Sequence, residues 1–152
     1  MSKKSKLYIL FFAGNNRYAL SAMDVIAVVP MAVLQAVPSG PDYLAGNLDY
    51  HGDLIPVVDI NMLIENKKIS LKLSTRILLV NIDTEIGRQA IGLLAEKVTE
   101  AVRINDESYS RIEMQTNNVA RHEVELKNRN GFLQHIDVME IFANTGKDLI
   151  FK

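Results

Sequence analysis

Residues 46–60 read Gly-Asn-Leu-Asp-Tyr-His-Gly-Asp-Leu-Ile-Pro-Val-Val-Asp-Ile, and this stretch predicts a β-hairpin. Two short strand-like runs, 44–50 and 54–58, flank His51-Gly52-Asp53. Gly52 is free to adopt the positive φ that tight hairpin turns require, so the turn is expected at this point.

The end of the same stretch predicts how the hairpin continues. Pro56 cannot donate a hydrogen bond to a sheet ladder, so its strand is expected at a sheet edge or at a bulge. Asp59 precedes an apolar run and is a suitable N-cap residue. The sequence therefore predicts a short helix over residues 60–65 directly after the second strand.

Composition narrows the function classes. The chain has 152 residues, 48% of them hydrophobic and 23% charged, with a net charge of -1. These values indicate one soluble domain, or two small subdomains sharing a core, with no electrostatic footprint for nucleic acid or for an anionic membrane. The absence of cysteine excludes disulfides, thiol nucleophiles and cysteine-ligated metals, and it suits the cytoplasm.

The N-terminal run is ambiguous at first sight. Lysines precede the apolar residues 7–13, as in a signal peptide, but this run is short and leads into a turn at residues 14–17. Residues 18–20 then continue as a second apolar run, so the pattern predicts a hairpin. No segment approaches the roughly 20 apolar residues that span a bilayer.

The remaining chain is a series of short strands separated by turns. The patterns predict strands at 25–29, 34–37, 77–80, 89–95 and 98–104, and a final hairpin from 124–126 and 131–136. Residues 105–123 are polar and are expected to form a long loop. A C-terminal helix is expected to begin at Asp137, carrying an apolar stripe.

The order of residues in the hairpin resembles the CheW-like coupling proteins of bacterial chemosensory systems. The matching positions are Gly46, Gly52, Pro56, Val58 and Asp59. Further similarity lies at residues 75–80, 91–94 and 131–133, and the resemblance covers about residues 7–143. The run at 92–96 and the run at 99–103 look most like the adaptors of Wsp-type surface-sensing systems.

The resemblance implies a mainly β fold made of two small five-stranded barrels, SH3-like or OB-like, that share a hydrophobic core. The first subdomain is expected over residues 15–70, and the second over 75–145 together with the strand at 7–14. The implied function is a non-catalytic, cytoplasmic adaptor. It would link the cytoplasmic tip of a chemoreceptor to the regulatory domain of a CheA-type histidine kinase, in arrays at the inner membrane.

The resemblance also implies contact residues. Those expected on or near a receptor groove, or beside another contact surface, are Val25, Ala27, Gly46, His51, Gly52, Gly92 and Val98. Two of them depart from the family pattern, because Ala27 stands where the family often has Glu and His51 where it usually has Arg. Val25 has a second interpretation, as an ordinary core residue.

Catalytic and metal-binding patterns are absent from the sequence. His51, His122 and His135 form no metal-binding motif, and no nucleophile elbow or glycine-rich phosphate loop is present. His51 lies near Asp49, Asp53 and Asp59, an arrangement that would suit a general base, although a solvated turn is the simpler interpretation. The sequence thus predicts no enzyme, cofactor or metal.

One other binding function stays open. Small β-barrels also bind oligonucleotides or peptides. Oligonucleotide binding requires a basic groove with stacking aromatic side chains. In this sequence the basic residues are scattered and the aromatic residues lie in apolar strands, so that alternative is less well supported.

Overall fold

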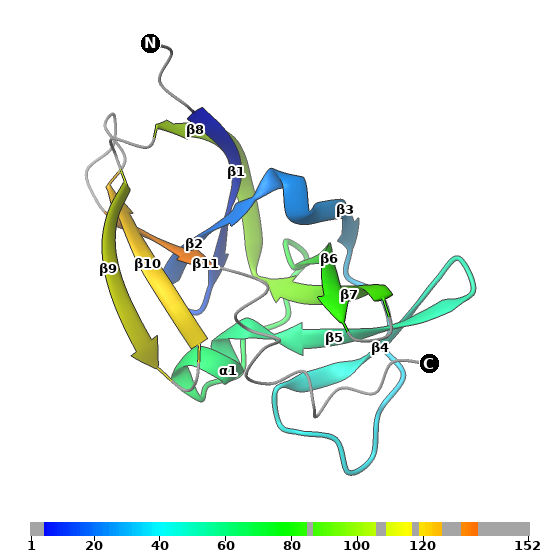
Figure 1. Cartoon of the computed structure of the whole chain (residues 1–152). Helices are drawn as coiled ribbons and strands as arrows, with labels where there is room; N and C mark the ends of the chain where they lie inside the picture. The colour runs from blue at the N-terminus through cyan, green and yellow to red at the C-terminus, as the bar shows by residue number, and fades with distance from the viewer. Residues whose placement is uncertain (1–4, 85–86, 106–108, 117–118, 126–131, 137–152) are drawn as a thin grey trace.

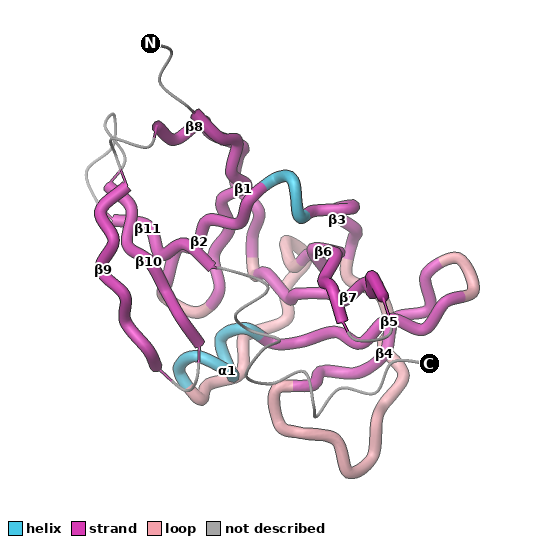
Figure 2. Tube along the Cα trace, in the orientation of Figure 1, coloured by secondary structure: helices cyan, strands magenta, loops and turns pink. Residues whose placement is uncertain are grey.

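The computed structural model describes residues 5–84, 87–105, 109–116, 119–125 and 132–136, and these residues form two β-sheets with one short α-helix (Figures 1 and 2). The strands are β1 (Ser5–Ala13), β2 (Asn16–Ser21), β3 (Val25–Pro30), β4 (Leu44–Tyr50), β5 (Asp53–Asp59), β6 (Arg76–Thr84), β7 (Gly87–Ala95), β8 (Lys97–Asn105), β9 (Tyr109–Thr116), β10 (Val119–Glu125) and β11 (Phe132–Ile136). A 3-10 turn, η1 (Ala22–Asp24), precedes β3, and α1 (Ile60–Glu65) follows β5. The expected mainly β fold class is confirmed.

One sheet has six strands in the order β8-β1-β2-β11-β10-β9 and lies at the left of Figure 1. β1 and β2 form the antiparallel hairpin expected at the N-terminus. β10 and β11 form the expected final hairpin, and β11 joins β2 in parallel. This parallel contact brings the C-terminal strand of the described chain beside its N-terminal hairpin.

The other sheet has five strands in the order β3-β6-β7-β5-β4. The β4–β5 hairpin is present as expected, and β5 joins β7 in parallel with Val57 opposite Gly92. β6 and β7 are two of the three inner strands and are buried on both faces over residues 77–80 and 91–95. Their continuous apolar runs, in place of alternation, are typical of strands covered on both sides.

The two sheets do not coincide with the subdomain limits expected from the sequence. β2 falls within the expected first subdomain, residues 15–70, but it pairs with β1 in the six-stranded sheet. β6 and β7 fall within the expected second subdomain, residues 75–145, but they lie between β3 and β5. The reason is burial, because two strands that are apolar on both faces need neighbours and cover on every side.

The strand of Pro56 was expected at a sheet edge or at a bulge, and the edge alternative is wrong, since β5 is flanked by β4 and β7. The ladder between β5 and β7 covers residues 57–59 only and begins immediately after Pro56. No hydrogen bond from position 56 to β7 is therefore needed. A register shift between Leu44 and Gly46 of β4 lies opposite the same part of β5.

Two other expectations are corrected. Residues 34–37 form no strand, and only Gln35 makes an isolated bridge, to Asn47, before Pro38 interrupts further pairing. Most of the expected loop at 105–123 is the antiparallel hairpin of β9 and β10. β9 is an edge strand of its sheet, and edge strands often carry polar side chains, so their composition resembles that of a loop. The helix expected from Asp137 lies outside the described residues.

A single large core connects the two sheets, as the family resemblance implied. Phe11 and Tyr18 of the six-stranded sheet belong to the same buried cluster as Leu79 and Leu93 of the five-stranded sheet. The Phe11 and Tyr18 ring centroids are 5.6 Å apart in a tilted arrangement. Because each fully buried side chain of this size contributes about 1.5–3 kcal/mol, this shared core ties the two sheets into one unit.

Candidate functional site

The turn between β4 and β5 is a two-residue loop in which both residues have positive φ. His51 has φ 53° and Gly52 has φ 90°, the backbone that a type I′ hairpin turn requires. The Gly52 N–H donates to the Asp49 carboxylate at 3.1 Å. The Tyr50 and His51 rings are arranged edge to face, with their centroids 4.3 Å apart. Asp49 is thus engaged by the turn itself, and His51 is an exposed turn residue.

This geometry does not favour a catalytic role for His51. Of the other two nearby carboxylates, Asp53 is exposed at the start of β5, and Asp59 is buried at the N-terminus of α1, whereas His51 lies at an exposed tip. Within the described parts of the chain, no group of three His, Cys, Asp or Glu side chains is placed to hold a metal ion. The solvated-turn interpretation accounts for what the structure shows at His51.

Gly46 is a close-approach glycine in β4. It is buried with φ 147°, and a Cβ atom at this position would lie 2.8 Å from both the Gln35 carbonyl oxygen and the Leu34 Cβ. Gln35 and Asn47 exchange two backbone hydrogen bonds of 2.8 Å beside it. Gly46 therefore lets the β3–β4 connection, residues 31–43, pack directly against β4.

Gly92 and Val98 also pack against residues of the core. Gly92 is buried in β7, where a Cβ atom would lie 2.7 Å from Ile77 Cγ2 and 3.0 Å from Val57 Cγ2. Val98 is partly buried in β8, opposite Phe11, and packs against the main core. Gly92 has no exposed surface and Val98 is only partly exposed, and their expected position on or near a groove stays a prediction.

Val25 and Ala27 lie on the inward face of β3, an edge strand of the five-stranded sheet. Both are partly buried and pack against the core. Ile26 and Val28 alternate with them and face outward, 45% and 42% exposed. The exposed side chains of β3 are therefore the neighbours of those that the resemblance indicated.

The structure adds exposed apolar residues that the sequence reasoning did not select. The most exposed are Met23 (88%), Val33 (96%), Leu71 (62%) and Leu73 (100%). A signal was available for Val33 alone, which lies within residues 25–41, a run that contains no charged side chain. Two of these residues, Val33 and Leu71, line the same groove, and exposed apolar patches are typical of interaction sites in soluble proteins.

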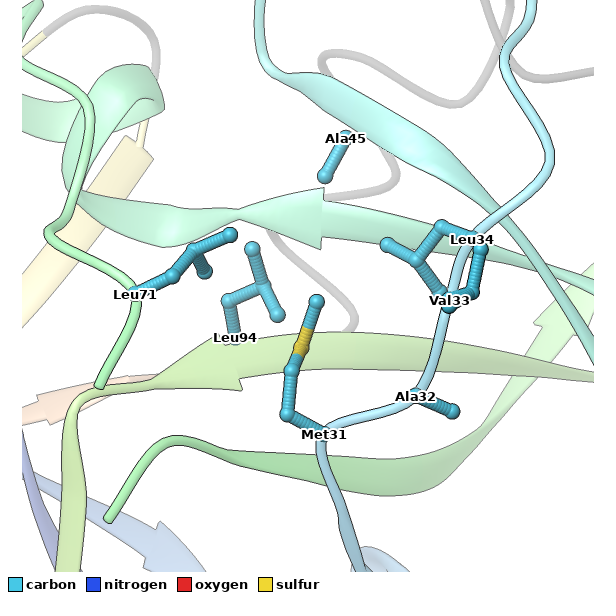
Figure 3. A pocket seen from close by; sticks show the side chains of 7 residues that line it. All are labelled: Met31, Ala32, Val33, Leu34, Ala45, Leu71 and Leu94. Atoms are coloured by element: carbon cyan, nitrogen blue, oxygen red, sulfur yellow. The ribbon is translucent and has the colours of Figure 1, made fainter. Parts of the chain in front are cut away.

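An apolar groove lies next to β3 (Figure 3). Its volume is about 620 Å³, and its lining residues are Met31, Ala32, Val33, Leu34, Ala45, Leu71 and Leu94. No side chain in this lining is charged. The groove therefore suits an apolar protein side chain or segment and offers no basic surface to an oligonucleotide.

Comparison with known proteins identifies the family. The model of the CheW-like domain matches residues 7–145. This chain belongs to the CheW-like domain family.

Two curated relatives and one solved structure agree with this assignment. The chemotaxis protein CheW of Helicobacter pylori is 26% identical over 97 residues, 64% of this chain and 56% of that protein. The chemotaxis protein CheW of Klebsiella aerogenes is 18% identical over 100 residues, 66% of this chain and 58% of that protein. The chain thus spans a little over half the length of these relatives.

The structural match covers more of the molecule. The scaffolding protein CheW of Thermoanaerobacter tengcongensis is 22% identical and superposes with a TM-score of 0.80, over 99% of this chain and 96% of that one. The likeness shows that the two proteins share the CheW-like fold. Membership of the Wsp-type subgroup stays a prediction.

Asp59 is a buried carboxylate that ties the start of α1 to the segment that leads to the groove residue Leu71. Its Oδ1 accepts from the Met62 N–H at 3.1 Å, which confirms the expected N-cap of α1. Its Oδ2 accepts from the Ile69 N–H at 3.0 Å, two residues before Leu71. Burial raises the pKa of the Asp59 carboxyl above its usual range, while these backbone hydrogen bonds act in the opposite direction.

The seven candidate contact residues do not form one cluster. Val25 and Ala27 lie on the β3 edge, and Gly46 lies behind Leu34 of the groove. His51 and Gly52 lie at the tip of the hairpin that includes β4, the opposite edge strand of the same sheet.

The described helices include none that is long and apolar enough to cross a membrane.

Proposed function

We propose that this CheW-like chain is a non-catalytic adaptor that links the cytoplasmic tip of a chemoreceptor to the regulatory domain of a CheA-type histidine kinase. The observation that carries the proposal is the uncharged segment 25–41, which supplies an exposed edge strand and one side of an apolar groove. Family membership supports the kind of partner. In this proposal the protein acts in the cytoplasm and reaches the inner membrane through its partners.

An adaptor needs two separable surfaces, and the fold offers two. The first surface comprises the outward side chains of β3, Ile26 and Val28, with the adjoining groove. The second is the β4–β5 tip, where His51 is exposed and Leu54 is 51% exposed. The groove reaches β4 only at Ala45, and neither His51 nor Leu54 lines it, so two partners would contact different parts of the molecule.

The chemistry of these surfaces supports specialised partners. Ala27 and His51 stand at positions where the family often carries Glu and Arg, and Arg forms paired hydrogen bonds that His does not reproduce. With no charge on residues 25–41, affinity on the first surface would come mainly from apolar burial. Its partner should therefore present apolar side chains and few charged groups that need an ion pair.

Binding of purified full-length protein to a receptor cytoplasmic domain and to a kinase regulatory domain, both from the same cell, tests the proposal. Val28→Glu should weaken binding of one partner at least about tenfold, or 1.4 kcal/mol, and leave the other unchanged. Lys97→Glu, at an exposed position of the other sheet, is the matched control. Equal binding by Val28→Glu and the natural protein would remove the β3 surface from the proposal.

The proposal that the protein is not a catalyst has a separate test. Elemental analysis of untagged protein should find no stoichiometric metal. Stoichiometric zinc or iron would contradict the adaptor proposal and revive an enzymatic interpretation.

A further inference from the structure

Residues 66–75, which connect α1 to β6 and are called here the strap, are anchored at two places. The first anchor lies near the start of the strap. The Asp59 carboxylate accepts from the Ile69 N–H at 3.0 Å, and the Asn61 side-chain amide donates to the Lys67 carbonyl at 2.8 Å. Ile69 is itself buried, so this end of the strap is fixed to the core.

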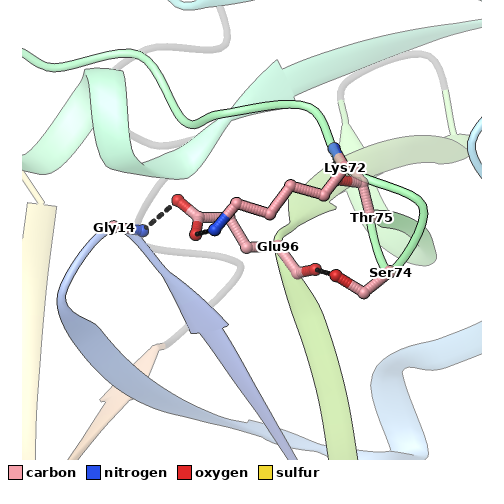
Figure 4. A network of polar contacts seen from close by, with 5 residues as sticks. All are labelled: Gly14, Lys72, Ser74, Thr75 and Glu96. Atoms are coloured by element: carbon pink, nitrogen blue, oxygen red, sulfur yellow. Dashed lines mark hydrogen bonds and ion pairs between the residues drawn. The ribbon is translucent and has the colours of Figure 1, made fainter.

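The second anchor is Glu96, the residue between β7 and β8 where the chain passes from one sheet to the other (Figure 4). Lys72 Nζ lies 3.7 Å from Glu96 Oε2, and Ser74 Oγ donates to the Glu96 carbonyl at 2.8 Å. Glu96 Oε1 also accepts from the Gly14 N–H at 2.9 Å, in the β1–β2 turn. One residue thus contacts the strap and the six-stranded sheet together.

Leu71 lies between the two anchors and forms part of the groove wall. It is 62% exposed, so burial contributes little to holding it in place. Its position depends on the anchors on either side. The Glu96 anchor is the weaker one, because the Lys72 side chain is 60% exposed and a solvated ion pair stabilises little.

We propose that Glu96 acts as a latch. Its contacts hold the strap, and with it the Leu71 wall of the groove, in a position that depends on how the two sheets lie relative to each other. A partner that shifts the β1–β2 turn relative to the strap would release Lys72 and Ser74 and widen the groove. By linkage, an occupant that displaces Leu71 would loosen the contact between the sheets. This inference concerns movement within the chain and goes beyond the proposed function, whatever the partners are.

Native-state hydrogen exchange on the full chain tests the latch. The double variant Lys72→Met/Ser74→Ala removes both strap contacts and leaves the bond between Glu96 and Gly14. The Lys72 N–H bonds to Thr75 Oγ1 and the Thr75 N–H to the Lys72 carbonyl, so both amides should exchange at least about tenfold faster. The Ile69 amide, held by Asp59, should keep its rate.

Arg88→Met is the matched control, because it also removes one positive charge and breaks an exposed ion pair, that with Asp83 at 3.4 Å. It should leave all strap amides unchanged. Unchanged exchange at Lys72 and Thr75 in the double variant would overturn the proposal. Equal acceleration at Ile69 and at core amides of β6 would overturn it too, because that result indicates general destabilisation.

The groove itself can be measured, since the chain has no natural cysteine. Spin labels at Val33→Cys and Ser70→Cys, two exposed positions, would report the distance between the β3–β4 connection and the strap. The distance distribution should shift or broaden in the double variant and stay unchanged in Arg88→Met. An identical distribution in all three proteins contradicts the coupling of latch and groove.

Discussion

Gly92 and Ile77 lie in diagonal contact across the β6–β7 pair, where a Cβ atom on residue 92 would be 2.7 Å from Ile77 Cγ2. Both residues are completely or almost completely buried, and Val57 closes the other side at 3.0 Å. Position 92 therefore determines how closely β6, β7 and β5 pack.

Gly92→Ala should destabilise the protein by about 1–3 kcal/mol, because one added methyl overpacks a filled core. Chemical denaturation measures the loss. Leucine has no γ2 methyl branch, so Gly92→Ala/Ile77→Leu should lose less stability than the sum of the two single variants. Strict additivity would show that the contact with Ile77 is not the cause.

Val25→Arg and Ile26→Arg should separate core from surface on β3. Val25 faces inward and packs against the core, so an arginine there should cost several kcal/mol and lower the melting temperature strongly. Ile26 is 45% exposed, so its arginine should leave the melting temperature nearly unchanged and weaken partner binding. The reverse pattern would exchange the roles assigned to the two faces.

The turn at His51 predicts a specific order of stabilities. His51→Asn should be neutral or slightly stabilising, because asparagine tolerates positive φ in a type I′ turn. His51→Val should destabilise by about 1–2 kcal/mol, since a β-branched residue is strained in this region. Urea denaturation of both variants would check the order, and equal stability would contradict the turn assignment.

His51 is also predicted to tune partner choice. His51→Arg restores the residue that the family usually carries and should narrow the affinity gap between cognate partners and a chemotaxis counterpart, by roughly 1 kcal/mol. His51→Ala controls for loss of the imidazole alone. Unchanged affinities in all pairings would falsify the hypothesis.

Asp59 predicts a pH dependence of stability. Because burial raises its pKa in the folded state, the fold favours the protonated carboxyl, and this contribution is fully present below the unfolded value of about 3.9. It is lost as pH rises from there through the raised pKa. Asp59 should thus destabilise the natural protein progressively over that window, relative to Asp59→Asn.

The measurement is the difference in free energy of unfolding between the natural protein and Asp59→Asn, followed from low to neutral pH. Asparagine replaces one of the two acceptors for Met62 and Ile69 with a donor, which adds a constant offset independent of pH. The natural protein should lose stability relative to the variant as pH rises. The opposite slope would mean that the hydrogen bonds outweigh burial.

Several elements were predictable because they depend on residues close in sequence. The β4–β5 hairpin follows from glycine in its turn, and the N-terminal hairpin from polar turn residues between two apolar runs. The helix start follows from a side chain that bonds to a backbone N–H three residues later. Such short-range geometry is determined by local conformation and capping, so the sequence by itself predicts it.

The choice of neighbouring strands was decided only in the tertiary structure. The parallel contact of β5 with β7 places Val57 beside Gly92, and the groove is lined by Leu71 as well as by Leu34, which lies far from it in the sequence. The local sequence pattern indicates whether a strand is apolar on one face or on both. It does not indicate which other strand will pack against that face. That selection depends on burying all such faces together in one packed core, which is a property of the whole fold.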